Sequence, residues 1–579
     1  MQQMFISRYV IIIFDSFDIV KASSINCLYF ISVINCALLL ASIYSGSLST
    51  TRKIQTSTSF IYIGTVTMVD VWVLTLALCV VLIAALYYYM TGLLRYFRDR
   101  EIPEVNNYAI LEIIKVIFQR ITVAGVVLKM YRSHPDAKYV GSFDMLTPVL
   151  TIRDLELIKS ITVKNFEHFQ DHKMILVSST EPLFNKNLLG LTGDRWKEVR
   201  NLLSPAFTSS KMKAMFTLMR ECGDRYGKYF ATLPENGRSV ELKDAFTRYT
   251  NDVIATCSFG VNVDSMADRD NKFYVYGKTA TTFGALEMLK FLVQRTVPRL
   301  SLFLGIRVLS PAICSFFENL VATTIKTRDE QGIVRPDMIQ LMMETRGKLG
   351  PGKELTIEDM TAQAFIFYLG GFESTSILMC FAAYEIGVNP EIQKRLQEEI
   401  DEVLESNNGE VTYEAINDMK YLDAVINEAL RMYPAIVVTD RVCTKPFELP
   451  PALPGLKSHI IEKDCLVSIP IYGIQQDPQY FDTPTKFKPD RFLDDSKKIL
   501  NSGAFLSFGA GPRMCIGNRF ALLETKVLLF NLFARCNLKP NSKTTIPMRL
   551  KGFQMTSAGG FWFDIEPRKV AAPDLVTSD

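Results

Sequence analysis

The stretch that decides the fold runs from Phe508 to Gly517 and reads FGAGPRMCIG. The residues that follow, RFALLETKVLLFNLFA, have the length and composition of a helix. A helix that begins just after Cys515 turns its free N–H groups toward the sulfur, which favours the thiolate. Glycines in the stretch allow tight turns and close approach of the backbone. The pattern therefore predicts a cysteine thiolate that ligates a metal ion.

The overall composition narrows the class of protein. The chain has 579 residues, is 48% hydrophobic and carries a net charge of +3, so it can bury a large core. It contains no long run of one charge, which argues against a nucleic-acid partner. Its 11 cysteines are scattered, odd in number and without a CxxC pair. This usage argues against a disulfide scaffold or a zinc cluster.

Arg513, two residues before the cysteine, can pair with a carboxylate. The whole segment resembles the haem-binding loop of the cytochrome P-450 superfamily, FxxGxRxCxG, at every fixed position. The resemblance implies that the cofactor is haem b and that Cys515 is the axial ligand of its iron. It further implies that Arg513 meets a haem propionate. Phe508, Gly511 and Gly517 would complete the loop that holds the cofactor.

Two further segments match motifs of the same family. Glu428 and Arg431, in EALR, share a helix face and can form an ion pair. This pair is similar to the family's ExxR motif, and PDRF resembles the segment that adds Arg491 to it. The resemblance implies a buried structural triad of one carboxylate and two guanidinium groups.

Other positions resemble the family's propionate contacts. Trp196 and Arg200, in WKEVR, match its WxxxR pattern, and Arg441 lies in DRVC at another such position. With these segments the resemblance spans about residues 130–570. It implies that all three side chains help to bind the cofactor.

The sequence GGFEST, from Gly370 to Thr375, resembles the distal helix of the family, [AG]GxxT. The resemblance implies that O2 is a co-substrate and that Glu373 and Ser374 supply protons as a general acid relay. Ser374 replaces the usual threonine, and Thr375, displaced by one position, is a further candidate for the catalytic hydroxyl. A hydroxyl remains, so we expect an oxygenase whose relay has a less restricted rotamer.

The remaining pattern predicts a mainly α fold with a smaller β portion. Residues 154–440 are mainly helical, Val140–Ile152 has strand character around a turn, and roughly 540–566 alternates as strands do. Three helices can be placed by their end signals: one from a capping box at Thr356 and Asp359 to about Val388, one after Asn389-Pro390, and one near Met419–Met432.

The N-terminal region predicts a membrane anchor. Val71 to Met90 is uncharged and about 20 residues long, enough to span a bilayer. Asp70 precedes it, and Arg95, Arg98 and Arg100 follow, so the catalytic domain should face the cytosol. By resemblance the membrane is the endoplasmic reticulum.

The predicted organisation has three parts. Residues 1–67 form an extension of uncertain role, 68–100 the transmembrane anchor with its basic flank, and 101–579 the single catalytic domain. A second apolar stretch within the extension, Leu28 to Tyr44, has several readings: a second span, a signal-like segment or neither. Because Met68 immediately precedes the anchor, we expect the extension to be dispensable.

No Rossmann or P-loop fingerprint is present. Electrons are therefore expected from a partner: by resemblance a membrane-bound, NADPH-dependent flavoprotein reductase, with cytochrome b5 as a second candidate. The resemblance also implies which positions line the substrate pocket. These positions are mostly apolar, which favours small lipophilic substrates. The pocket residues are Phe365, Phe372, Ala435, Ile436, Val437, Val438 and Met555.

The anchor, the RVC sequence and the closing SAGGFWFDIEPR are most similar to insect microsomal detoxification enzymes. This similarity favours oxidation of xenobiotics, although related scaffolds process hormones and fatty acids. Two other classes stay open: an oxygen-independent haem-thiolate isomerase or dehydratase, and a haem sensor or inactive paralogue. The acid and hydroxyl at Glu373 and Ser374 argue against the first, and the intact cysteine loop argues against the second.

Overall fold

The computed structural model describes residues 120–568 except 146, 174–179, 283, 347–353, 495 and 553–554, together with scattered positions between 75 and 116. The chain divides into two compact units, Met1–Arg100 and Glu101–Asp579. The extension at 1–67 lies outside the described residues, as does most of the span at Val71–Met90. The positions described within that span are helical.

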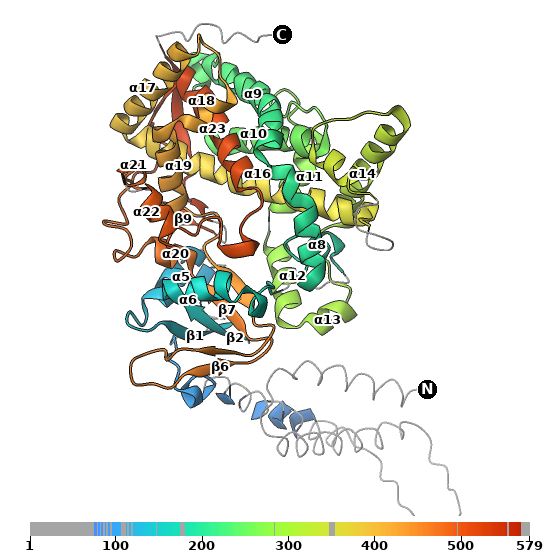
Figure 1. Ribbon diagram of the computed structural model, residues 1–579, viewed down its shortest axis with the longest axis vertical. Coiled ribbons are helices and arrows are strands. Elements are labelled where there is room, and N and C mark those ends of the chain that lie inside the picture. The colour runs from blue at the N-terminus through green and yellow to red at the C-terminus, as the bar shows by residue number, and fades with distance from the viewer. Residues whose placement is uncertain are drawn as a thin grey trace, which may run out of the picture. The chain divides into compact units, whose positions relative to one another are not determined.

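The second unit is mainly helical, as predicted (Figure 1). Its α-helices are α5 (Val123–Arg132), α6 (Leu155–Lys159), α7 (Pro182–Asn185), α8 (Gly193–Leu203), α9 (Ser209–Ala231), α10 (Leu242–Ile254), α11 (Lys272–Thr281), α12 (Ala285–Thr296), α13 (Pro298–Phe303), α14 (Pro311–Gln331), α15 (Met338–Met343), α16 (Ile357–Val388), α17 (Pro390–Ser406), α18 (Tyr413–Asp418), α19 (Lys420–Met432), α20 (Ile471–Gln475), α21 (Arg491–Asp494), α22 (Ser496–Asn501) and α23 (Asn518–Arg535).

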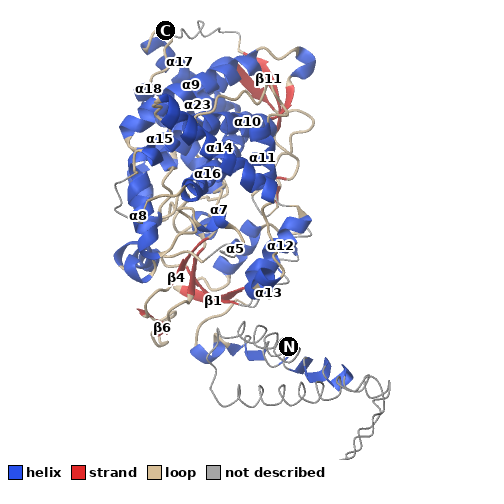
Figure 2. Cartoon of the chain, turned by 90° about the vertical axis from the view of Figure 1, so that its right-hand side faces the viewer, coloured by secondary structure: helices blue, strands red, loops and turns tan. Residues whose placement is uncertain are grey.

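The strands form small sheets, with β1, β4 and β6 at one end of this helical body and β11 at the other (Figure 2). They are β1 (Tyr139–Asp144), β2 (Thr147–Ile152), β3 (Ser239–Glu241), β4 (Thr439–Val442), β5 (Phe447–Leu449), β6 (His459–Ile461), β7 (Leu466–Ile469), β8 (Cys536–Lys539), β9 (Leu550–Lys551), β10 (Thr556–Ser557) and β11 (Trp562–Pro567). The largest sheet has the order β1-β2-β7-β4, and a second has the order β3-β11-β8.

The predicted strand regions are confirmed. The expected turn at Val140–Ile152 is an antiparallel hairpin of β1 and β2, in which Tyr139 faces Ile152. β7 joins β2 in parallel, and β4 pairs antiparallel with β7, so that Arg441 lies opposite Val467. The C-terminal strands pair as β9–β10 and as β8–β11–β3. The first sheet thereby places Arg441 at the site described below.

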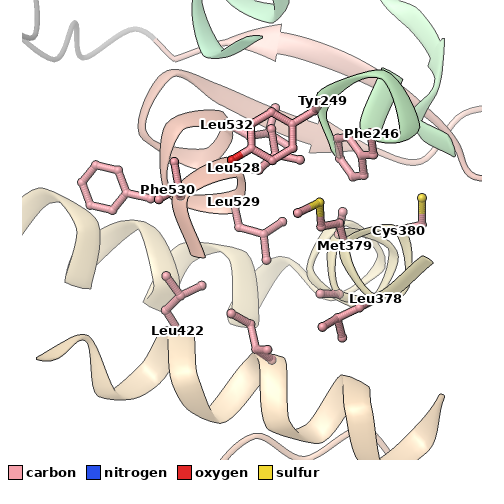
Figure 3. Packing of buried hydrophobic residues seen from close by; sticks show 14 of the residues in the cluster. Phe246, Tyr249, Leu378, Met379, Cys380, Leu422, Leu528, Leu529, Phe530 and Leu532 are labelled. Carbon is pink, nitrogen blue, oxygen red and sulfur yellow. The ribbon is translucent and has the colours of Figure 1, made fainter. Parts of the chain in front are cut away.

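The core is built where α10, α16, α19 and α23 meet. Side chains from all four helices pack together there, among them Tyr249, Met379, Leu422 and Leu529 (Figure 3). Among the described residues, α16 is the one helix long and apolar enough to cross a membrane. Most of its side chains are buried by neighbouring helices, which is the pattern of a core helix.

The predicted helix ends are confirmed, with one difference in detail. α16 begins at a capping box, in which the N–H of Asp359 donates to Oγ1 of Thr356 at 3.0 Å and the N–H of Thr356 donates to the Asp359 carboxylate at 3.0 Å. Asn389 does occupy the N-cap position of α17, but its side chain caps nothing there. Its amide instead donates to the carbonyl of Glu385 at 2.8 Å, so it closes the preceding helix.

Candidate active site

The loop before α23 is shaped by its glycines. The N–H of Cys515 donates to the carbonyl of Phe508 at 2.8 Å, which closes the turn. Gly509 and Gly511 have φ of 77° and 71°, a conformation that costs an L-residue about 1–2 kcal/mol. A Cβ on Gly511 would also collide with the carbonyl oxygen of Thr162. These two positions therefore require glycine, and α23 begins immediately after Gly517.

The thiol of Cys515 is accessible, although protein surrounds most of it. This burial raises the pKa of the thiol above its ordinary value. A hydrogen bond from the N–H of Gly517 and the positive charge of Arg200 act in the opposite direction: they lower the pKa and so favour the thiolate. The protein alone thus supplies the amide donor expected of a helix start, and one guanidinium group.

Three guanidinium groups gather beside this loop: Arg200 from α8, Arg441 from β4 and Arg513 from the loop itself. The charges of Arg200 and Arg441 help to lower the pKa of Arg513, which burial brings down to about 10. Arg513 lies over the ring of Trp196, with its Cζ 4.0 Å from the ring centroid. It also donates to Asp171 and to the carbonyls of Gln170, Leu188 and Leu191, at 2.7–3.3 Å.

Arg441 is buried and forms no direct ion pair with a carboxylate among the described residues, although the charge of Asp440 acts on it. It donates to its neighbour's carbonyl, Asp440 O, at 2.6 Å and to Ala510 O at 3.4 Å. Its Nε has no hydrogen-bond partner among the described residues. Burial lowers its pKa to about 10. A buried guanidinium with a free donor is stabilised by an added anion, so the residues present fit a group that carries carboxylates, as haem does.

His172 is a site residue that the sequence reasoning did not single out. Its ring Nδ1 lies 2.9 Å from the carboxylate of Asp440, which also accepts the N–H of Lys173 at 2.8 Å. Burial lowers the pKa of His172, and the charges of Arg441 and Arg513 lower it further. A lone histidine in a loop carries no sequence pattern, so only the fold reveals this contact.

The two segments of the predicted triad meet in the core. Arg431 donates from Nε and Nη2 to both oxygens of Glu428, at 2.7 and 2.9 Å. Nε of Arg491 lies 3.1 Å from the same carboxylate, and the Arg491 guanidinium reaches Asp482 at 2.7 Å. The side chains of Glu428 and Arg431 have no exposed surface. Every charge in this cluster has an opposite partner.

Gln475, which the sequence reasoning missed, joins the triad to the cysteine loop. Its amide donates to the carbonyl of Arg431 at 2.9 Å, and its own carbonyl accepts the N–H of Leu506 at 2.8 Å. Arg431 in turn donates to the backbone carbonyl of Gln475 at 2.8 Å. Gln475 thus connects the triad to Leu506, which lies two residues before Phe508, where the loop begins. The side chain of Gln475 is fully buried.

On α16, Gly370 and Ser374 lie on one accessible face, which we call the open face. A Cβ at Gly370 would meet nothing within 4 Å, whereas a Cβ at Gly371 would press on Ile254 of α10. Gly370 therefore borders open space, and Gly371 allows two helices to pack closely. The hydroxyl of Ser374 donates to the carbonyl of Gly370. Thr375 is 1% exposed, and its hydroxyl has no partner among the described residues.

The open face and the cysteine loop share a neighbour. The ring of Phe207 packs edge-on against Phe367 of α16, with centroids 5.7 Å apart. A Cβ on Gly517 would touch the same ring at 3.7 Å.

The side chain of Glu373 is turned toward α10, where its carboxylate lies 3.0 Å from Nζ of Lys243. The structure thus brings Ser374, and not Thr375, to the accessible side of the helix.

The residues predicted to line the substrate pocket differ in how exposed they are. Phe365 and Phe372 are fully buried in an aromatic cluster that includes Phe317 and Tyr368, and their role in lining the pocket stays a prediction. Val437 and Met555 are buried in the main core. Ala435 and Val438 are partly exposed, and Ile436 is 56% exposed.

Comparison with known proteins identifies the family. The family model described as Cytochrome P450 matches residues 125–562. "Cytochrome P450 9e2" of Blattella germanica is 42% identical over 86% of this chain and 98% of its own length. "Probable cytochrome P450 9f2" of Drosophila melanogaster is 39% identical over 76% and 89%, and "Cytochrome P450 6B2" of Helicoverpa armigera is 33% identical over 84% and 97%.

The chain therefore belongs to the cytochrome P450 family. Membership makes it a monooxygenase of the haem-thiolate class, which uses O2 and electrons from a redox partner.

Proposed function

We propose that this monooxygenase inserts one oxygen atom of O2 into small lipophilic compounds, chiefly xenobiotics, at the endoplasmic reticulum membrane. The observation that carries the proposal is the unmatched positive charge beside an accessible cysteine thiol. The similarity of the chain to insect cytochromes P450 of families 9 and 6 supports a detoxification role. The apolar, partly exposed segment around Ile436 supports a lipophilic substrate.

In this proposal the chain's own residues hold the cofactor from two sides. Cys515 ligates the iron, with the N–H of Gly517 donating toward the sulfur. Arg200 and Arg441 neutralise the propionates, and the free Nε of Arg441 gains an acceptor. Arg513, with Trp196 beneath it, is committed to backbone carbonyls and fixes the loop. When bound, the haem supplies oxygen activation, which a thiolate ligand favours by promoting O–O cleavage.

Proton delivery is assigned to the distal helix. Ser374 presents its hydroxyl on the open face beside the space at Gly370. Glu373 would take protons from solvent, and Ser374 or water would carry them along the open face toward the cofactor site. The buried hydroxyl of Thr375 takes no part in this route.

The electron donor is an NADPH-dependent flavoprotein reductase in the same membrane, with cytochrome b5 as a second donor. The chain has no nucleotide-binding fingerprint of its own. Membrane attachment is assigned to the predicted anchor and its basic flank at residues 68–100. Hydroxylation of endogenous hormones or fatty acids by the same chemistry is the competing substrate assignment, which a substrate panel resolves.

The test is turnover by the purified full-length protein with reductase. A panel of lipophilic xenobiotics, a steroid and a fatty acid is incubated with NADPH under air and under nitrogen. The proposal expects hydroxylated xenobiotic products that require both NADPH and O2. Product formed equally well without O2 would instead indicate an isomerase or dehydratase. Turnover of the steroid or fatty acid alone would overturn the xenobiotic assignment.

A further inference from the structure

The acid on the distal helix is held by a residue from a different helix. Lys243 lies in the first turn of α10, and its Nζ is 3.0 Å from the Glu373 carboxylate. The same ammonium donates to the hydroxyl of Ser376 at 2.7 Å. The side chains of Lys243 and Glu373 are only 22% and 19% exposed. Charges withdrawn from water to this extent attract each other more strongly than an exposed pair.

No other group in the described part of the chain anchors this carboxylate. Apart from this ion pair with Lys243, the side chain of Glu373 accepts no hydrogen bond from any residue that the structure describes. Its backbone carbonyl accepts one from Ser376 at 3.0 Å, but that bond fixes the helix and not the acid. The orientation of the Glu373 carboxylate therefore depends on the charge of Lys243.

The pair lies where the buried and open faces of α16 meet. α10 packs on the buried face: Thr250 donates to the carbonyl of Phe372 at 2.9 Å, and Tyr368 donates to Asn251 at 3.1 Å. Successive residues of a helix are about 100° apart, so Glu373 lies beside Ser374 but is turned toward α10. Lys243 thus holds the acid at the edge of the open face.

We propose that Lys243 is a positioning residue for proton delivery: its ammonium holds the Glu373 carboxylate in the orientation from which a proton is passed to the open face. This rests on the proposed function, in which Glu373 is the acid. In the step, the Glu373 carboxylate first takes a proton from solvent; the O–H bond of the resulting acid then breaks as the proton passes to a hydroxyl or water on the open face, and the carboxylate returns to its ion pair with Lys243. Lys243 keeps its charge throughout. Without the ammonium, the carboxylate samples other rotamers and is less often productive.

The experiment compares Lys243→Gln, which removes the charge, with Lys243→Arg, which keeps it. Product and peroxide are measured per NADPH consumed, and the decay of the oxygenated ferrous protein is followed by stopped flow. A misplaced proton donor lowers the yield of a step, so Lys243→Gln should form about three- to tenfold less product per NADPH, with peroxide making up the difference. Lys243→Arg should restore coupling to within about twofold, because a charged donor remains. Lys243→Met serves as a second neutral variant if Lys243→Gln does not load haem.

The same pair of variants is made in the Glu373→Gln background. If Lys243 acts through Glu373, Lys243→Gln should change neither coupling nor decay there. Lys228→Gln is the matched control, since that lysine pairs with Asp224 within α9. An equal effect of Lys243→Gln in both backgrounds, or none in the wild-type background, would overturn the proposal and leave the acid role of Glu373 standing. Full coupling in Glu373→Gln alone would overturn that acid role and the proposal with it.

Discussion

The cysteine loop and the open face of α16 are held in place by different kinds of contact. The loop is fixed by backbone: two glycines in the left-handed region, a closed turn at Cys515, and buried side chains that reach carbonyl groups. The open face depends on single side chains, such as the Ser374 hydroxyl and the Lys243–Glu373 ion pair. We infer that the loop tolerates almost no substitution, while the open face can vary in order to tune the reaction.

The largest effect on the cysteine loop is expected from a substitution in the triad of Glu428, Arg431 and Arg491. Removing the carboxylate in Glu428→Ala leaves the buried Arg431 guanidinium without its ion-pair partner and leaves Arg491 with Asp482 alone, which costs ~3–5 kcal/mol. Because domains have only ~5–15 kcal/mol of stability, little haem-loaded protein should form. Haem content per milligram of purified protein measures this. Soluble, fully loaded Glu428→Ala would show that the triad does not support the loop.

Gly511→Ala is expected to have the next largest effect. It adds a strained conformation and a collision with the carbonyl of Thr162. The strain costs about 1–2 kcal/mol and overpacking about 1–3 kcal/mol more. Gly455→Ala is the matched control, since Gly455 has φ of 88° but open space around its Cβ position. Urea unfolding should show a larger loss for Gly511→Ala; equal losses would mean that the close approach is unimportant.

The difference between the two sides also explains what the sequence could predict. FGAGPRMCIG predicted the tight turn and the helix start after it, because these constraints are local and belong to residue types, whereas the contacts of Arg513 with residues 170–191 were not predicted. His172, Gln475 and Lys243 were missed, because each acts on a partner far along the chain. No local pattern marks such pairings.

The open face was predicted only in part. α16 is apolar on nearly every side, so hydrophobic periodicity does not indicate which side opens. Phe365 and Phe372, which are predicted to line the pocket, pack in the aromatic cluster around Phe317 and Tyr368. Gly370 and Ser374 were placed by their motif and do lie on the accessible face. A motif fixes which residues matter, but packing decides how the helix is rotated.

Arg441→Met tests whether the unmatched charge binds the cofactor. The substitution keeps an apolar stem but removes the free donor and the buried charge. A hydrogen bond to a charged group contributes about 1.5–3 kcal/mol, so haem should be lost about 10–100-fold more readily. Transfer of haem to apomyoglobin measures this. Arg346→Met, at an exposed ion pair, is the control. Unchanged haem retention would remove Arg441 from the cofactor site.

The smallest effect on stability is expected at Ser374. Ser374→Ala should keep haem and substrate binding but lower product per NADPH by about 10–100-fold, equivalent to ~1.4–2.7 kcal/mol of barrier. Thr375→Val removes a buried, unpaired hydroxyl and should leave coupling unchanged. If Thr375→Val uncouples and Ser374→Ala does not, α16 is rotated relative to the arrangement described here.

The ligand assignment of Cys515 is the central claim, and one spectrum tests it most directly. The reduced full-length protein is exposed to CO, and its absorption is compared with that of Cys515→Ala and of Cys536→Ala, a buried cysteine in β8. A thiolate ligand should give the band of a thiolate-ligated ferrous–CO haem in the wild type and in Cys536→Ala, and the band should be absent in Cys515→Ala. The same band in Cys515→Ala would contradict the account.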